Sequence, residues 1–125
     1  MSGGTGNGKK PADQLTPEDL CQFTGTDNWY KHWMGRILYT DGVKYFAEMA
    51  GAYWFIDVVG SVWNIISVEE FVSIKMMVKE GKANVVMDDG NGKVIYTQAI
   101  EFTDCPEGDW QFFLEGNVLL VPSEH

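Results

Sequence analysis

Residues 71–102 read FVSIKMMVKEGKANVVMDDGNGKVIYTQAIEF, and this stretch decides the fold class. From Val72 to Val78 apolar residues alternate with mostly polar ones, which is the pattern of a half-buried β-strand. The run DDGNG at 88–92 is typical of a hairpin turn, since glycine and asparagine tolerate the positive φ angles that such turns need. The stretch therefore predicts antiparallel strands. On the strand expected over 93–102, the inner face would consist of Val94, Tyr96, Ile100 and Phe102.

A helical region precedes these strands. Between residues 43 and 66 the apolar side chains recur three to four positions apart, which is the spacing of one helix face. Gly51 interrupts the region, and glycine disfavours a helix interior by about 1 kcal/mol relative to alanine. We therefore expect either two helices with a break near Gly51 or one bent helix.

Shorter helical segments are expected nearer the N-terminus. Thr16 is a good N-cap for a short helix over 17–23. Trp29 and Trp33 are four residues apart, which predicts a helical turn over 28–33 with both rings on one face.

The remaining patterns complete an α+β fold. Strand-forming runs lie at 36–40, 110–114 and 118–121, each ended by a glycine-containing turn or by a proline. We expect N-terminal helices packed on a C-terminal antiparallel meander sheet of four to five strands. Residues 15–125 would form this single α+β domain, and residues 1–14 would form a flexible, glycine-rich arm.

The charge of the chain is strongly negative and unevenly distributed. Lys and Arg number 9 against 18 Asp and Glu, which gives a formal net charge of −9. Residues 83–125 hold eight of the acids and only one base, Lys93. Phosphate groups bind to clustered positive charge, so we expect no direct nucleic-acid binding and no docking on an anionic membrane.

This acidity has two interpretations. One is general solubility, which is common in small acidic domains. The other is a negative face that meets a protein partner, such as a basic nucleic-acid-binding protein. The candidate contacts are Glu101, Asp104, Glu107 and Asp109, with Trp110 as their aromatic anchor.

The chain is rich in aromatic residues, with five Trp, five Tyr and seven Phe. A tryptophan-rich core would account for them. Alternatively, Trp29, Tyr30 and Trp33 stay at the surface, where large aromatic side chains often mark an interface with a partner or a second subunit.

Signals for catalysis or metal binding are weak. The two Cys and two His lack the close paired spacing of a metal site, so we expect no metal and no cofactor. His32 would pack its ring among the neighbouring aromatic residues. An alternative is a small enzyme in which His32 acts with Tyr39 or Asp57, in a pocket lined by Trp29, Trp33 and Trp54.

Asp57 lies inside the most apolar helical region, between Ile56 and Val58. We interpret it mainly as part of a solvated polar edge shared with Ser61 and Asn64. A buried Asp57 would instead need a partner and would have a raised pKa.

Cysteine content and hydropathy bear on the compartment. Two cysteines are fewer than a small disulfide-dependent secreted domain carries. The most apolar stretch, residues 43–66, is interrupted by charged side chains and is no credible membrane span. We therefore expect a cytoplasmic protein.

Several short motifs resemble one family. They are QFTGT at 22–26, WYKH at 29–32, LYTDGVKY at 38–45, AGAYW at 50–54, EFTD at 101–104 and LLVPSE at 119–124. Together they resemble an uncharacterised domain-of-unknown-function family of small bacterial, plasmid and phage proteins. The resemblance covers about residues 15–125 and brings no known activity, substrate or cofactor. It implies an accessory protein of a mobile element, a class that often acts by binding a host or rival protein.

The expected function is that of a non-enzymatic protein-binding module that uses the acidic face. A narrower version is an inhibitor of a bacterial defence system, such as an anti-CRISPR protein, whose acidic face mimics nucleic acid against a basic groove. The alternatives are the small enzyme centred on His32 and a structural homo-oligomer with aromatic side chains at its subunit interface.

Overall fold

The computed structural model of the protein describes residues 15–23 and 28–124. The arm expected over residues 1–14 lies outside the described residues.

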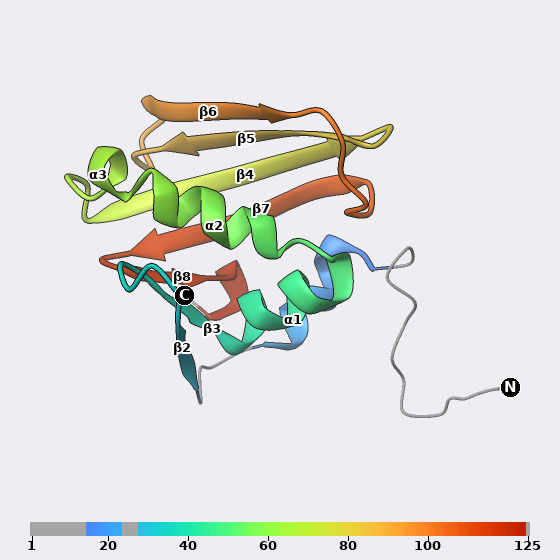
Figure 1. Ribbon diagram of the computed structural model, residues 1–125, viewed down its shortest axis with the longest axis horizontal. Helices are drawn as coiled ribbons and strands as arrows, with labels where there is room; N and C mark the ends of the chain where they lie inside the picture. Colours follow the sequence, from blue (N-terminus) through green and yellow to red (C-terminus); the bar gives the residue numbers. More distant parts are fainter. Residues whose placement is uncertain (1–14, 24–27, 125) are drawn as a thin grey trace, which may run out of the picture.

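A seven-stranded mixed sheet forms the centre of the fold (Figure 1). Its strands are β2 (Trp29–Lys31), β3 (Leu38–Thr40), β4 (Phe71–Lys79), β5 (Lys82–Asp88), β6 (Val94–Ile100), β7 (Gly108–Glu115) and β8 (Val118–Leu120). Across the sheet their order is β2-β3-β8-β7-β4-β5-β6, and every neighbouring pair is antiparallel except β3 and β8, which are parallel. The α+β class and the C-terminal strands are confirmed. The simple meander is wrong, because β7 pairs with β4 and the sheet also includes β2 and β3.

Three helices follow β3 in the chain: α1 (Asp41–Ala50), α2 (Tyr53–Ser61) and α3 (Trp63–Ile66). The predicted break is confirmed, since Gly51 ends α1 in the left-handed conformation at φ +64°. The expectation that the helices precede the whole sheet is wrong, because the hairpin of β2 and β3 comes before them. The short helix at the N-terminus is a 3-10 helix, η2 (Pro17–Gln22), and the Asp19 carboxylate accepts a hydrogen bond from the Thr16 N–H at 2.8 Å.

Residues 28–33 are not helical, because their pairing partner outweighs the local spacing of the tryptophans. Trp29 lies opposite Thr40 and Lys31 lies opposite Leu38, so this segment forms the edge strand β2. A strand of three residues carries too little alternation to be distinguished from a helical turn by its sequence. Trp29 and Trp33 therefore do not share a helix face.

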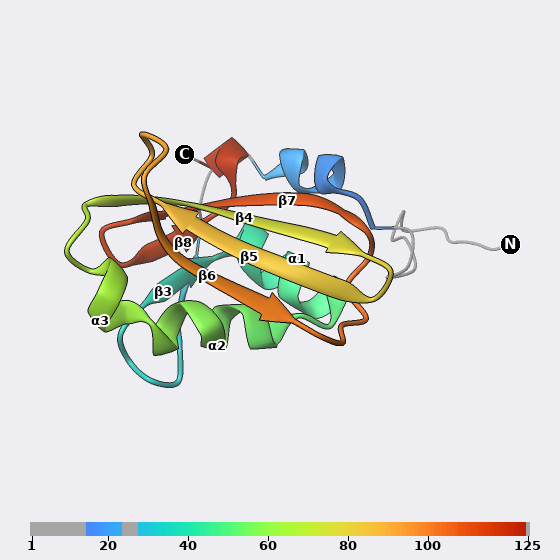
Figure 2. The ribbon, with the colours of Figure 1, turned by 90° about the horizontal axis from the view of Figure 1, so that it is seen from above.

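The sheet has a helix layer on one face and two short 3-10 helices on the other (Figure 2). The helices α1, α2 and α3 cover the first face, while η2 and η3 (Pro122–Glu124) lie over β7 on the opposite face. None of the helices within residues 15–23 or 28–124 has the length and apolar character that crossing a membrane requires.

The core lies between the sheet and the helix layer. Phe46 of α1 packs against Trp110 of β7 with 4.9 Å between ring centroids, and Phe55 of α2 packs against Phe112 of β7 at 4.6 Å. All four side chains are fully buried. The core thus holds four of the 17 aromatic side chains, and Trp110 is the one buried tryptophan among the described residues.

Candidate functional site

The segment that follows β6, together with the first two residues of β7, carries the four predicted acidic contacts. We call residues 101–109 the acidic loop. Its four carboxylate-bearing residues are all exposed: Glu101, Asp104, Glu107 and Asp109. The loop contains no basic residue of its own. It lies at the end of the sheet where β4 turns into β5, on the right in Figure 1.

Hydrogen bonds fix the backbone of the acidic loop to that turn. The Thr103 N–H donates to the Gly81 carbonyl at 2.8 Å. The Glu80 N–H donates to the Glu107 carboxylate at 2.8 Å. The Cys105 N–H donates to the Thr103 hydroxyl at 3.1 Å. The exposed side chains of the loop are therefore held on a backbone with a defined course.

Cys105 anchors the loop from inside. Its thiol is free and buried, and burial raises the pKa of Cys105 to about 12. A thiol with such a pKa is almost entirely protonated near neutral pH and is a poor nucleophile. Cys105 is thus a packing residue.

Two aromatic residues occupy the opposite environments from those predicted. Phe102, expected on the inner face, is 89% exposed, and Trp110, expected as a surface anchor, is only 1% exposed. Strand β6 ends at Ile100, which pairs with Ala83, so the alternation no longer directs Phe102 inward. Trp110 lies opposite the buried Met76 on the helix-covered face, and its indole N–H donates to the Pro106 carbonyl at 3.0 Å. The exposed aromatic side chain of the acidic loop is therefore Phe102.

A cleft of about 300 Å³ lies between α2 and the hairpin of β2 and β3. It is lined by residues 31–33, Tyr39, Tyr53, Ile56 and Asp57. The structure thus brings together the residues of the alternative enzyme hypothesis, with Trp33 as one wall. Trp29 and Trp54 do not line the cleft.

His32 and Asp57 are in direct contact in this cleft. His32 Nε2 lies 2.7 Å from Asp57 Oδ1, and the Trp33 indole N–H donates to the same oxygen at 2.8 Å. His32 is 4% exposed, whereas the Asp57 side chain is 49% exposed. Asp57 is therefore part of a small polar cluster and not merely of a solvated helix edge.

A glycine makes the room for the imidazole ring. A Cβ at Gly60 of α2 would lie 2.9 Å from Cε1 of His32, closer than such atoms approach in proteins. On the other side the Trp33 ring lies 5.5 Å from the His32 ring, between centroids. The predicted packing of His32 against neighbouring aromatic residues is confirmed for Trp33.

The three aromatic surface candidates behave differently. Trp29 and Trp33 are exposed. Tyr30 is partly buried, because its hydroxyl donates to Asp41 at 2.8 Å and the Lys44 ammonium lies 4.4 Å from its ring centroid. The hydrogen bond to Asp41 is the main reason why the pKa of Tyr30 is raised. Trp29 and Trp33 remain candidates for an interface.

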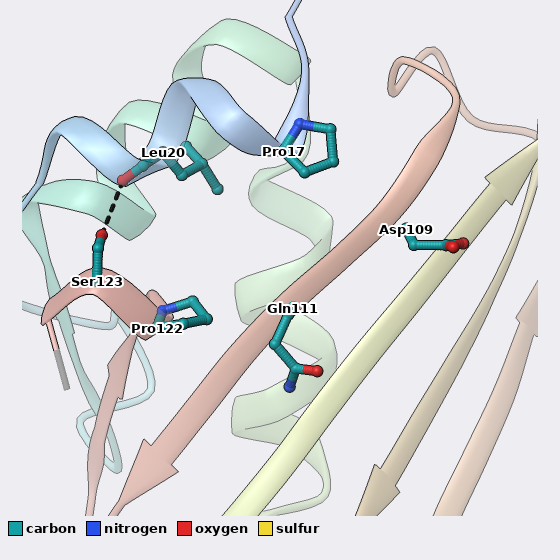
Figure 3. A pocket seen from close by; sticks show the side chains of 6 residues that line it. All are labelled: Pro17, Leu20, Asp109, Gln111, Pro122 and Ser123. Atoms are coloured by element: carbon teal, nitrogen blue, oxygen red, sulfur yellow. Dashed lines mark hydrogen bonds between the residues drawn. The ribbon is translucent and has the colours of Figure 1, made fainter.

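A smaller hollow lies between η2, η3 and β7 (Figure 3). Its volume is about 100 Å³, and Asp109 of the acidic loop is at its rim. The Ser123 hydroxyl closes one side by donating to the Leu20 carbonyl at 2.9 Å.

The arrangement defines an α+β protein with a mixed sheet, an acidic loop at one end and a His–Asp cleft beside the β2–β3 hairpin. Among residues 15–23 and 28–124, no three His, Cys, Asp or Glu side chains converge on a point that could hold a metal ion.

The chain belongs to the family described as Family of unknown function (DUF6876), which matches residues 14–125. This confirms the resemblance that the short motifs indicate. No curated protein and no solved structure matches the chain.

Proposed function

We propose that the protein is a non-enzymatic binding module that engages a basic protein partner through its acidic loop. The observation that carries this proposal is the exposure of Phe102, 89%, on a hydrogen-bonded backbone and among exposed carboxylates. Burial of this ring in a complex would remove its apolar surface from water, which is favourable.

The two kinds of side chain would contribute differently to binding. Burial of a phenylalanine ring in a pocket of the partner stabilises a complex by about 1.5–3 kcal/mol. The carboxylates increase the association rate and select a partner of opposite charge, more than they add affinity. The proposed partner surface is thus an apolar pocket surrounded by Lys and Arg.

A narrower form of the proposal concerns the biological context. In it the chain is an accessory protein of a mobile element that inhibits a bacterial defence system. The acidic loop would occupy a groove that otherwise binds nucleic acid, because it carries four exposed carboxylates and no basic residue of its own. The adjoining turn does carry two exposed lysines, Lys79 and Lys82. Competition between the chain and DNA or RNA for the partner would support this form. Simultaneous binding of both would contradict it.

Affinity capture from cells of the source organism tests the proposal. One variant neutralises the loop by Glu101→Gln, Asp104→Asn, Glu107→Gln and Asp109→Asn, changes that retain hydrogen-bond acceptors for contacts such as the one to Glu80. A matched control removes the same number of charges elsewhere, by Glu18→Gln, Glu48→Gln, Glu69→Gln and Glu70→Gln.

The expected result is one stoichiometric basic partner with the wild type and with the control variant, but not with the loop variant. Association should also weaken as salt concentration rises, because exposed charges are screened. Association that survives molar salt and the loop variant would contradict the proposal.

A small enzyme is the second candidate, and the 2.7 Å contact of His32 with Asp57 is the observation that favours it. If His32 acted as a general base, His32→Ala would abolish the biological effect of the chain while the fold and the captured partner were retained. An unchanged effect would remove this candidate.

A further inference from the structure

Asp57 is the one carboxylate among the residues that line the His–Asp cleft. His32 and Trp33 both contact its Oδ1, at 2.7 and 2.8 Å. Within the described part of the chain, the other oxygen, Oδ2, has no hydrogen-bond partner. The Asp57 carboxylate is therefore held in one orientation by two contacts and retains one free acceptor atom on a half-exposed side chain.

His32 fits the role of a positioning residue for this carboxylate. Its Nδ1 accepts a hydrogen bond from the Met34 N–H at 3.4 Å, which assigns the ring proton to Nε2, the atom that faces Asp57. Both ring nitrogens are thus in use, and the ring is packed against Gly60. A donor group of a ligand in the cleft therefore finds its acceptor in Asp57 and not in a ring nitrogen of His32.

Aromatic side chains form the walls around this carboxylate. Trp33, Tyr39 and Tyr53 all line the cleft. The faces of aromatic rings attract cations, and tryptophan does so most strongly. Burial raises the pKa of Tyr39 and of Tyr53, and the negative charge of Glu48 raises both further, so Glu48 adds a negative contribution at the two hydroxyls. The walls and the carboxylate therefore favour a positively charged group.

The geometry of Asp57 also selects among cations. A guanidinium group binds best to both oxygens of a carboxylate, but Oδ1 already accepts two contacts. The single free oxygen suits a compact group with an N–H donor, such as an alkylammonium. The cleft volume of about 300 Å³ is at the lower end for ligand pockets, so it suits a small molecule.

We propose that the cleft between α2 and the β2–β3 hairpin binds the alkylammonium group of a small organic ligand, with Asp57 as its counter-ion and Trp33, Tyr39 and Tyr53 as its walls. Lys31 is the one Lys or Arg among the residues that line the cleft, and its charge opposes this binding. Its side chain is exposed, and its Cε lies near Gly35 in the turn. The site is independent of the acidic loop and goes beyond the proposed function.

Two-dimensional NMR of the full chain tests the proposal through the indole N–H of Trp33. This resonance is assigned with Trp33→Phe, and it reports directly on the hydrogen bond to Asp57. The probe is n-butylammonium chloride, titrated at constant ionic strength against sodium chloride. The controls are 1-butanol and sodium butyrate, which share the alkyl chain but are neutral and anionic. We expect a saturable shift with the ammonium probe alone. An equal shift with 1-butanol, or no shift with any probe, would overturn the proposal.

Two variants change the charge in opposite directions. Asp57→Asn keeps an oxygen acceptor for His32 and Trp33 but removes the charge, and we expect at least a tenfold weaker affinity for n-butylammonium. Lys31→Gln removes the opposing charge and should strengthen binding severalfold. Glu70→Gln, at an exposed position that does not line the cleft, serves as the matched control and should leave the affinity unchanged. Affinity that is the same in Asp57→Asn and the wild type, or that falls in Lys31→Gln, would contradict the proposal.

Discussion

Alanine at Trp110 and alanine at Phe102 should have opposite consequences, although both remove a large aromatic ring next to the same loop. Trp110 is 1% exposed, packs on Phe46 at 4.9 Å and donates a hydrogen bond to Pro106. Replacement of a buried tryptophan by alanine costs about 3–5 kcal/mol, and the Pro106 carbonyl also loses its donor. Phe102 makes no comparable contact at 89% exposure, so Phe102→Ala should change the free energy of unfolding by less than about 0.5 kcal/mol.

These free energies translate into a clear difference in thermal unfolding. For a domain of this size 1 kcal/mol shifts the midpoint by roughly 4 °C, so Trp110→Ala should lower it by roughly 12–20 °C and Phe102→Ala by no more than roughly 2 °C. Circular dichroism during heating, supported by urea titration, measures both. Trp110→Phe should lie between the two. A large loss of stability in Phe102→Ala, or a small loss in Trp110→Ala, would refute the assignment of the two rings to surface and core.

Three further outcomes follow from the structure. Gly60→Ala should destabilise the fold by about 0–2 kcal/mol. The clash with His32 costs about 1–3 kcal/mol, and the higher helix preference of alanine offsets about 1 kcal/mol of that cost. An unchanged chemical shift for the His32 ring in this variant would contradict the predicted clash. Burial raises the pKa of Cys105 to about 12, so the folded state favours the neutral thiol and loses stability as pH rises from the ordinary value of 9.0 towards 12. Iodoacetamide should accordingly modify Cys105 only after denaturation, and rapid modification of the native chain would count against its burial. If the exposed Trp29 forms a subunit interface, the wild type should sediment as a dimer in analytical ultracentrifugation and Trp29→Ala as a monomer. A monomeric wild type would contradict the homo-oligomer alternative.

The helices and strands could be predicted from the sequence where the pattern of apolar residues extended over many positions. The alternation from Val72 to Val78 predicts β4, and Gly51 marks the break between α1 and α2. The three-residue strand β2 was missed, because it is defined by its pairing with β3 and not by its own periodicity. The parallel pairing of Leu38 with Val118 joins segments far apart in the chain, and no local pattern encodes such a contact.

The sequence predicted only part of each candidate site, because side-chain directions depend on where strands end and how they pair. Residue type and charge identified the acids of the acidic loop and singled out Asp57 as unusual in an apolar helix. The directions of Phe102 and Trp110 were reversed, since they depend on where β6 ends and on the register of β7. The space for the His32 ring exists because residue 60 is a glycine. The only sign of this in the sequence was a glycine in the interior of a predicted helix.

The proposed role of Phe102 in binding is tested most directly by the dissociation constant of a captured partner, compared between the wild type and Phe102→Ala. Loss of about 1.5–3 kcal/mol of ring burial corresponds to a weakening of roughly 10–150-fold, and the small change in stability expected for the variant would assign this weakening to the interface. We predict a weakening in that range. A dissociation constant that changes less than about twofold would contradict the account, because the exposed ring would then have no part in binding.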